Sequence, residues 1–183
     1  MACWGRSAPS GVFVDVDGDS GDMCAVEAAT GSVSCWNYAN ASLPSVAGSF
    51  SDVSVTSFHA CAIEEGTRFV RCWFTDSTYR DVGNIVSLTP SDLAVDQVDI
   101  GSQYACAIRT SDGELQCWGA VLPNVPTNVS FTSIDVAEGS TDGCGIRADN
   151  GATQCWGSLV APVGTLFDEV SVTGNTACGV RSI

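Results

Sequence analysis

Residues 106–119 read CAIRTSDGELQCWG, and four other stretches of the chain repeat this pattern of two cysteines and a tryptophan. Three of them are intact, at residues 24–37 (CAVEAATGSVSCWN), 61–74 (CAIEEGTRFVRCWF) and 144–157 (CGIRADNGATQCWG). The fifth is split between the two ends, where residues 178–183 read CGVRSI and residues 1–5 read MACWG. All ten cysteines and all five tryptophans of the 183 residues fall in these units. The repeat therefore decides the fold.

The spacing of the two cysteines in each intact unit predicts a β-hairpin. Ten residues separate them, and placing Cys106 opposite Cys117 on an antiparallel pair sets Arg109 opposite Glu114. The turn that remains contains the Asp-Gly pair ending at Gly113, and glycine tolerates the positive φ that tight turns need. Opposed Cβ atoms lie at about the distance that a disulfide spans.

This geometry predicts five disulfides. The four intact units predict the pairs Cys24–Cys35, Cys61–Cys72, Cys106–Cys117 and Cys144–Cys155. The split unit predicts a fifth pair, Cys3–Cys178, which would join the two ends of the chain. Zinc sites use shorter Cys-x-x-Cys spacings, which do not occur here, and free buried thiols are the other alternative. Because disulfide-rich proteins belong in oxidising compartments, we expect an extracellular, periplasmic or cell-surface location.

A second shared phrase precedes each first cysteine and predicts the innermost strand of the unit. It occurs at residues 13–16 (FVDV), 50–53 (FSDV), 95–98 (VDQV), 131–134 (FTSI) and 167–170 (FDEV). Apolar and polar residues alternate around it, which is typical of strands. In the fourth unit the phrase lies two residues further from its cysteine, which indicates an insertion near Gly139.

Successive tryptophans are 32, 37, 45 and 38 residues apart, and no stretch has a helical pattern. A period of about 40 residues built from short strands is typical of propeller blades. We expect an all-β fold in one domain, residues 1–183: a five-bladed β-propeller closed by the N-terminal CWG strand, which joins the last blade. The repeats would cover about residues 6–37, 38–74, 75–119, 120–157, and 158–183 together with 1–5.

The charge balance limits the partners. The chain has 21 acidic and 7 basic residues, all of the latter arginine, for a net charge of −14. Phosphate backbones would repel such a chain, so we expect no nucleic acid partner. No apolar run approaches the roughly 20 residues of a membrane span, so no membrane insertion is expected. A solvated acidic surface and an acidic face for a basic protein or cations both remain open.

No catalytic motif is visible, so we expect a non-enzyme without a cofactor. The single histidine, His59, sits on a repeat position, and no nucleophile motif, HExxH or phosphate loop occurs. Residues 15–22 (DVDGDSGD) have the carboxylate density of a calcium loop. They lack the glycine and glutamate that an EF-hand needs at Ser20 and Val26, so an ordinary strand and turn is the alternative.

Two sets of aromatic residues are candidates for binding. The five repeated tryptophans either pack between blades or stack on sugars. The longest connector, residues 73–93, contains Phe74, Tyr79 and Arg80. Loops on rigid scaffolds often carry function, and tyrosine and arginine are favoured binding anchors. We therefore name Phe74, Tyr79 and Arg80 as candidate binding residues, with a neutral insertion as the alternative.

The combined phrase FxxVxVGxxxxCAIRxxGxxxCWG resembles the repeats of the regulator of chromosome condensation family in their cysteine-rich bacterial form. The short period is similar to that of the secreted propeller-type β-lactamase inhibitor protein. The resemblance covers essentially the whole chain and implies a β-propeller, although the best-known members have seven blades. The family's chromatin-binding role is not expected here, because the net charge is −14.

From these features we expect a monomeric, non-enzymatic module that binds another protein, or inhibits one, through its loop face. The partner is not identified by the sequence. One alternative is a glycan-binding propeller that uses pockets between blades. An excised or designed mini-propeller without a native function is another alternative.

Overall fold

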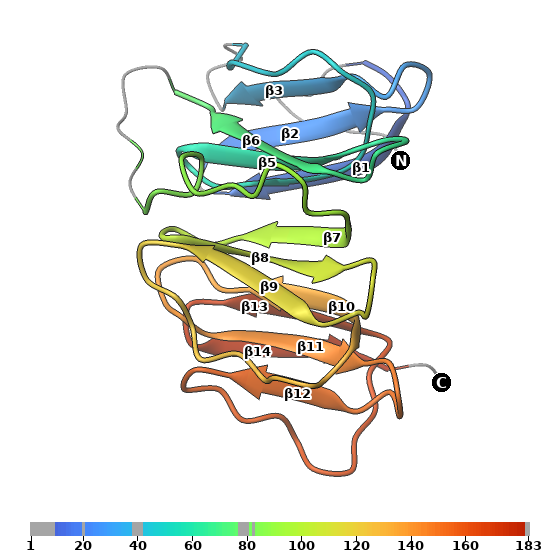
Figure 1. Ribbon diagram of the computed structural model, residues 1–183, viewed down its shortest axis with the longest axis vertical. Helices are drawn as coiled ribbons and strands as arrows, with labels where there is room; N and C mark the ends of the chain where they lie inside the picture. The colour runs from blue at the N-terminus through green and yellow to red at the C-terminus, as the bar shows by residue number, and fades with distance from the viewer. Residues whose placement is uncertain (1–9, 20, 38–41, 77–80, 82, 182–183) are drawn as a thin grey trace.

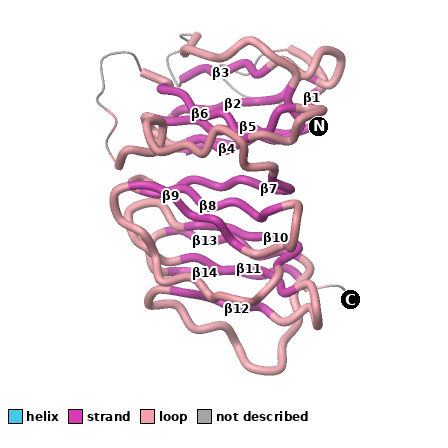
Figure 2. The backbone as a smooth tube through the Cα atoms, in the orientation of Figure 1, coloured by secondary structure: helices cyan, strands magenta, loops and turns pink. Residues whose placement is uncertain are grey.

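The computed structural model describes residues 10–19, 21–37, 42–76, 81 and 83–181. Within these ranges the chain forms strands, turns and loops and contains no helix (Figure 2). The all-β expectation is therefore confirmed. No described segment is a helix long and apolar enough to cross a membrane.

The described strands form five antiparallel sheets in chain order, each built from consecutive strands (Figure 1). The first four sheets have three strands each. They are β1 (Phe13–Asp19), β2 (Asp22–Glu27) and β3 (Val33–Asn37); β4 (Phe50–Val55), β5 (His59–Glu64) and β6 (Val70–Phe74); β7 (Val95–Ile100), β8 (Tyr104–Arg109) and β9 (Leu115–Gly119); β10 (Phe131–Val136), β11 (Gly143–Arg147) and β12 (Thr153–Trp156). The fifth pairs β13 (Glu169–Thr173) with β14 (Thr176–Val180). Residues 1–5, expected to complete it, lie outside the described residues.

The second and third strands of each intact unit pair as the cysteine spacing predicts. Cys106 lies directly opposite Cys117, and the backbone N–H of Arg109 donates to the carbonyl of Glu114 at 3.0 Å. Four disulfides are present, and each joins two directly opposed residues with Cα–Cα distances of 3.9 to 4.1 Å. They are Cys24–Cys35, Cys61–Cys72, Cys106–Cys117 and Cys144–Cys155.

The hydrophobic core lies between neighbouring sheets rather than inside one of them. Val26 and Val33 of the first sheet share a buried cluster with Phe50 and Val53 of the second. The next two sheet pairs repeat this arrangement. Because each sheet is a single layer, its apolar side chains leave water only when another sheet covers them. The four disulfide-linked hairpins therefore depend on one another for burial of their apolar side chains.

The first strand of each sheet is the innermost. β1 packs on β4, β4 on β7, β7 on β10, and β10 on β13. All five of these strands line one central cavity of about 260 Å³. Figure 2 shows β1–β6 in the upper half of the molecule and β7–β14 in the lower half.

Neighbouring inner strands are joined by polar side chains that accept hydrogen bonds from the backbone of the next sheet. We call these bonds cross-sheet rungs. Each acceptor lies on one inner strand, and the donor is a backbone N–H of the following inner strand or the turn after it, 2.6 to 3.3 Å away. The rungs are Val53 to Asp15, Val55 to Asp17, Ser57 to Asp19, Val98 to Asp52, Ile100 to Ser54, Ile134 to Gln97, Val136 to Asp99 and Val172 to Asp135.

The rungs explain why the inner strands tolerate buried carboxylates. The inner strand pairs with the second strand along one edge and has no paired strand along the other edge. The N–H groups of this free edge would therefore be buried without acceptors. Alternate side chains of the preceding strand point toward these groups and satisfy them. One position departs from the pattern: the buried Oγ of Ser133 has no hydrogen-bond partner, whereas Asp15, Asp52 and Gln97 at the same repeat position all accept one.

Removing a rung should cost more than removing a surface carboxylate from the same strand. Asp99 accepts from the Val136 N–H at 2.6 Å and from the Ser54 hydroxyl at 2.8 Å. Asp99→Ala leaves these buried donors unsatisfied, so the free energy of unfolding in urea should fall by about 1–3 kcal/mol. Asp96→Ala, on the exposed side of β7, should cost less than about 1 kcal/mol. Equal losses in the two variants would show that the rungs do not stabilise the fold.

Candidate functional site: the acidic channel mouth

The central cavity is lined mainly by carboxylates and hydroxyls. Its acidic members are Asp17, Asp19, Asp99, Asp135 and Glu138. They come from the first, third and fourth sheets. Alternation along an inner strand directs its valines and isoleucines toward the preceding sheet and the intervening polar residues toward the following one.

Burial raises the pKa of Asp17, Asp99, Asp135 and Glu138, because the charged form loses water. Burial, reinforced by the negative charge of Asp15, raises the pKa of Asp52 to about 7. Burial likewise raises the pKa of Asp135 to about 6, although the N–H of Val172 opposes the shift. The pKa of Asp99 lies well above its ordinary value for the same reason, with the charge of Asp135 adding to it. Part of the channel is therefore protonated near neutral pH.

Glu138 lies where the channel opens, in the turn between β10 and β11. This turn contains the insertion that the sequence indicated near Gly139. Burial, together with a side-chain hydrogen bond to Asp19 and its charge, raises the pKa of Glu138 to about 7. The insertion therefore brings a carboxyl group of the fourth sheet against one of the first.

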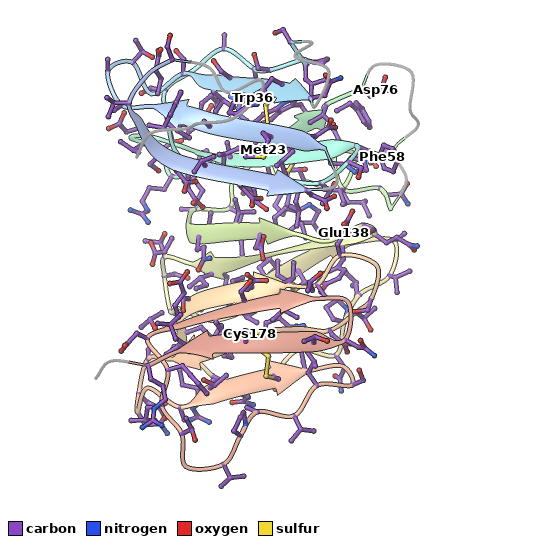
Figure 3. The ribbon with its side chains drawn as sticks, turned by 180° about the vertical axis from the view of Figure 1, so that it is seen from behind. Met23, Trp36, Phe58, Asp76, Glu138 and Cys178 are labelled. Carbon is purple, nitrogen blue, oxygen red and sulfur yellow. A yellow bond between two sulfur atoms is a disulfide. The ribbon has the colours of Figure 1, made fainter. Side chains whose placement is uncertain are left out.

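Further acidic residues surround this opening. The β1–β2 turn brings Asp22 close enough to Asp19 and Asp76 for their charges to raise its pKa, although burial is the larger cause. Figure 3 shows Phe58, Asp76 and Glu138 along the same side of the molecule. We call the set Asp19, Asp22, Asp76 and Glu138 the channel mouth.

Four described arginines lie away from the channel mouth, near the turns between the second and third strands. Their ion pairs are all with carboxylates of the outer surface: Arg68 with Asp96, Arg71 with Glu64, Arg109 with Asp112 and Glu114, and Arg147 with Asp149. Within the described part of the chain, no arginine forms an ion pair with Asp99, Asp135 or Glu138. These four arginines are therefore paired with carboxylates on the outer surface, and none of them is paired with the carboxyl groups along the axis.

The connector candidates are placed only in part. Phe74 ends β6, is half-buried, and packs on His59 with ring centroids 5.7 Å apart. Tyr79 and Arg80 lie outside the described residues. His59 is completely buried, with its Nε2 atom 3.4 Å from an Asp81 carboxylate oxygen. Burial lowers the pKa of His59, and Asp81 opposes this shift without reversing it. His59 and Phe74 therefore fix the start of the connector.

The acidic segment 15–22 forms part of the inner strand and its turn. Asp15, Asp17 and Asp19 all face the second sheet and accept backbone N–H groups from it. In the described ranges, no group of three or more histidine, cysteine or acidic side chains is arranged to hold a metal ion. The carboxylate density of this segment is thus explained by cross-sheet rungs.

The described tryptophans are buried. Trp73, Trp118 and Trp156 lie between sheets, and Trp36 packs with Phe13 and Ala25 of its own sheet. Trp36, Trp73, Trp118 and Trp156 have exposed fractions of 9%, 7%, 5% and 4%. A sugar-stacking platform needs an exposed ring face, so these four indoles do not provide one. Packing in the hydrophobic core is their role.

Sequence reasoning missed the cross-sheet rungs and the channel mouth. The signal was present in the second shared phrase, where the third position is Asp15, Asp52, Gln97, Ser133 and Glu169 in turn. All five can accept a hydrogen bond. Recognising the rungs required knowing which strand lies beside which, because each bond joins residues 37 to 46 positions apart.

No protein-family model matches the chain, and no curated protein sequence is significantly similar to it. Solved structures do match. The ectodomain of the receptor kinase CR4 from Physcomitrella patens is 24% identical, with a TM-score of 0.74, over 91% of this chain and 46% of that one. The CRINKLY WD40 ectodomain of the receptor kinase ACR4 from Arabidopsis thaliana is 22% identical, with a TM-score of 0.76, over 92% of this chain and 60% of that one.

Human WBSCR16 also matches, with 12% identity and a TM-score of 0.69 over 94% of this chain and 58% of that one. The chain thus spans less than two thirds of each of these proteins. At these identities the likeness shows the fold alone. Together with the small sheets around a common cavity, it identifies a propeller fold.

The buried carboxyl groups should make the protein more stable in mild acid than in mild base. Groups with raised pKa values bind protons more readily in the folded state, so their contribution is present at low pH and is lost as the pH rises through about 6–7. The lowered pKa of His59 acts in the opposite direction, but it is one group against several. Lowering the pH from about 8 to about 5 should raise Tm by at least about 3 °C.

Asp52→Asn should flatten this pH dependence, because its amide stays neutral across the range and can still accept the Val98 N–H. Asp92→Asn, on the exposed connector, is the matched control and should leave the dependence unchanged. Differential scanning calorimetry at several pH values measures both. If the Tm of the unmodified protein decreases when the pH is lowered from about 8 to about 5, the raised pKa values assigned to the buried carboxyl groups are wrong.

Proposed function

We propose that the protein is a non-enzymatic protein-binding module whose channel mouth binds a basic segment of its partner. The observation that supports this most directly is the separation of charge: arginines are paired on the outer turns, and carboxyl groups gather at the axis. Glu138 and Asp19 already hydrogen-bond each other across two sheets. A cationic side chain placed between them would relieve their repulsion.

The scaffold in this proposal is a five-bladed propeller with repeats of the regulator of chromosome condensation type. The N-terminal CWG strand joins the fifth blade and closes the ring. The five consecutive sheets, the shared cavity and the repeated hairpins support this arrangement. Four intrachain disulfides suit an oxidising, extracellular location.

A rigid scaffold suits recognition of another protein. Disulfides join the second and third strands of four sheets, and β2 and β11, which follow the channel-mouth turns, are both stapled in this way. Turns held next to such strands should lose little conformational entropy on binding. Two of the structural neighbours are receptor ectodomains by their descriptions, and ectodomains are exposed to extracellular partners. An inhibitor would be one form of this function, in which the partner is an enzyme.

The proposal can be tested with an oligoarginine peptide as the probe, using isothermal titration calorimetry at low salt. The double variant Asp22→Asn/Glu138→Gln removes two carboxylates from the channel mouth. Affinity should fall roughly threefold to tenfold, because each exposed charge pair contributes about 0.2–1 kcal/mol. Raising the salt concentration should weaken binding to the unmodified protein more than binding to the variant.

The matched control is Glu65→Gln/Asp92→Asn, which changes the net charge equally but at the β5–β6 turn and just before β7. Its affinity for the peptide should stay close to that of the unmodified protein. Equal losses in the two double variants would show that the peptide responds only to net charge. That result would contradict a binding site at the channel mouth.

A further inference from the structure

The last strand of the described chain has the sequence of a central strand but the environment of an edge. β14 reads TACGV, and all five of its residues are exposed. The second strands of the other sheets are largely buried, and their cysteines, at positions 24, 61, 106 and 144, are 0% exposed. The equivalent Cys178 is exposed and has no disulfide partner among the described residues. Edge strands of this kind invite pairing with another strand.

The four complete sheets show what a third strand supplies at this place. Each carries a tryptophan directly after its second cysteine, and in the second, third and fourth sheets the indole enters the interface with the preceding sheet. Trp73 packs among Cys24, Cys35 and Phe50. Its Nε1 donates to the carbonyl of Pro44 at 2.9 Å, in the connector between the two sheets. Trp118 repeats the arrangement with a connector carbonyl at 3.0 Å.

A small residue opposite the tryptophan makes room for the indole. In the second, third and fourth sheets the directly opposed residues are Ala60, Ala105 and Gly143. At Gly143 the space is fully used, because a Cβ atom there would lie 2.3 Å from the ring of Trp156. The residue at this position in the fifth sheet is Ala177.

Between the fourth and fifth sheets, the corresponding place is an apolar groove of about 320 Å³. Its lining matches that of Trp73 position by position. Cys144 and Cys155 occupy the repeat positions of Cys24 and Cys35, and Phe167 occupies that of Phe50. Ala177 and Gly179 occupy the positions of Ala60 and Ala62. The connector from Leu159 to Pro162 borders the groove, as the connector containing Pro44 borders Trp73.

We propose that this groove is a socket for the side chain of Trp4, and that residues 2–5 (ACWG) form the third strand beside β14. The inference rests on the proposed closure of the propeller by the N-terminal strand, and it identifies the contact that holds this strand in place. Trp4 follows Cys3 as Trp73 follows Cys72, so pairing that places Cys3 opposite Cys178 also places Trp4 opposite Ala177. The segment from Gly5 to Phe13 spans up to about 27 Å, which allows it to run from this strand to β1.

The disulfide that locks the strand forms by exchange with an oxidised thiol compound such as glutathione disulfide. The thiols of Cys3 and Cys178 together lose two protons and two electrons, and a new S–S bond joins them. The disulfide of the oxidant accepts these electrons and protons and is released as two thiols. Insertion of Trp4 favours this exchange because it holds the two sulfur atoms close together.

The decisive experiment is peptide mapping of the non-reduced full chain after equilibration in a glutathione redox buffer. We expect a Cys3–Cys178 peptide from the monomer, together with the four described disulfides. Alkylation of Cys178 as a free thiol, with those four disulfides intact, would overturn the proposal. So would a covalent dimer joined through Cys3 of one copy and Cys178 of another, because the occupant would then be a second copy.

The socket itself is tested by varying its two sides. Trp4→Ala and Ala177→Leu should each lower the equilibrium constant for forming the Cys3–Cys178 bond against glutathione by about tenfold or more, equivalent to at least about 1.4 kcal/mol. Val163→Ala, on the same connector but 99% exposed, is the control and should leave the constant unchanged. Equal constants in all variants would show that the disulfide forms without the socket.

These results are separable from the proposed function. Oligoarginine binding reports on the channel mouth, whereas the redox constant reports on the groove between the fourth and fifth sheets. If the peptide fails to bind while the Cys3–Cys178 bond forms, only the binding proposal is wrong. If the peptide binds and Cys178 stays free, only the socket is wrong.

Discussion

The cross-sheet rungs are the interaction on which the rest of the structure depends. Each sheet satisfies its own backbone by antiparallel pairing, but the inner strand presents N–H groups to a neighbour with which it does not pair. Burying them without acceptors would cost about 1–3 kcal/mol each. Asp15, Asp17 and Asp52 supply these acceptors from the preceding sheet, so the sheets can pack closely around one axis.

This solution brings negative charge to the centre of the molecule. A carboxylate is a strong acceptor, but several of them around one cavity repel one another and lose water. The raised pKa values of Asp52, Asp135 and Glu138 are the consequence. Partial protonation relieves the repulsion, and a basic group entering from outside would relieve it in the same way. The features that hold the inner strands together therefore also determine what the channel mouth can attract.

The local features of this fold were predictable from the sequence, and the non-local ones were not. The pairing of Cys106 with Cys117 follows from a spacing of ten residues and a turn sequence, because both partners lie on one hairpin. The placement of Asp99 against Val136 depends on which sheets are neighbours, and the spacing within one repeat does not contain that information. Phe74 is a candidate for its place on the longest connector, and its contact with His59 is another feature that the spacing within a repeat does not show.

The division between local and non-local forces also sets where the structure is strongest. Each disulfide closes a short hairpin, a contribution of roughly 3 kcal/mol in the chain-entropy model, but none of the four described disulfides joins one sheet to another. Cohesion between sheets rests on the buried indoles and the rungs, as Trp73 and its bond to Pro44 illustrate. An interface that lacks an indole is consequently the weakest contact between neighbouring sheets. The groove beside Ala177 lies at such an interface. Among the described residues, the fourth and fifth sheets are joined by the Val172 rung, by the hydrogen bond from the Ser140 hydroxyl to the Gly174 carbonyl and by an apolar cluster, but by no indole.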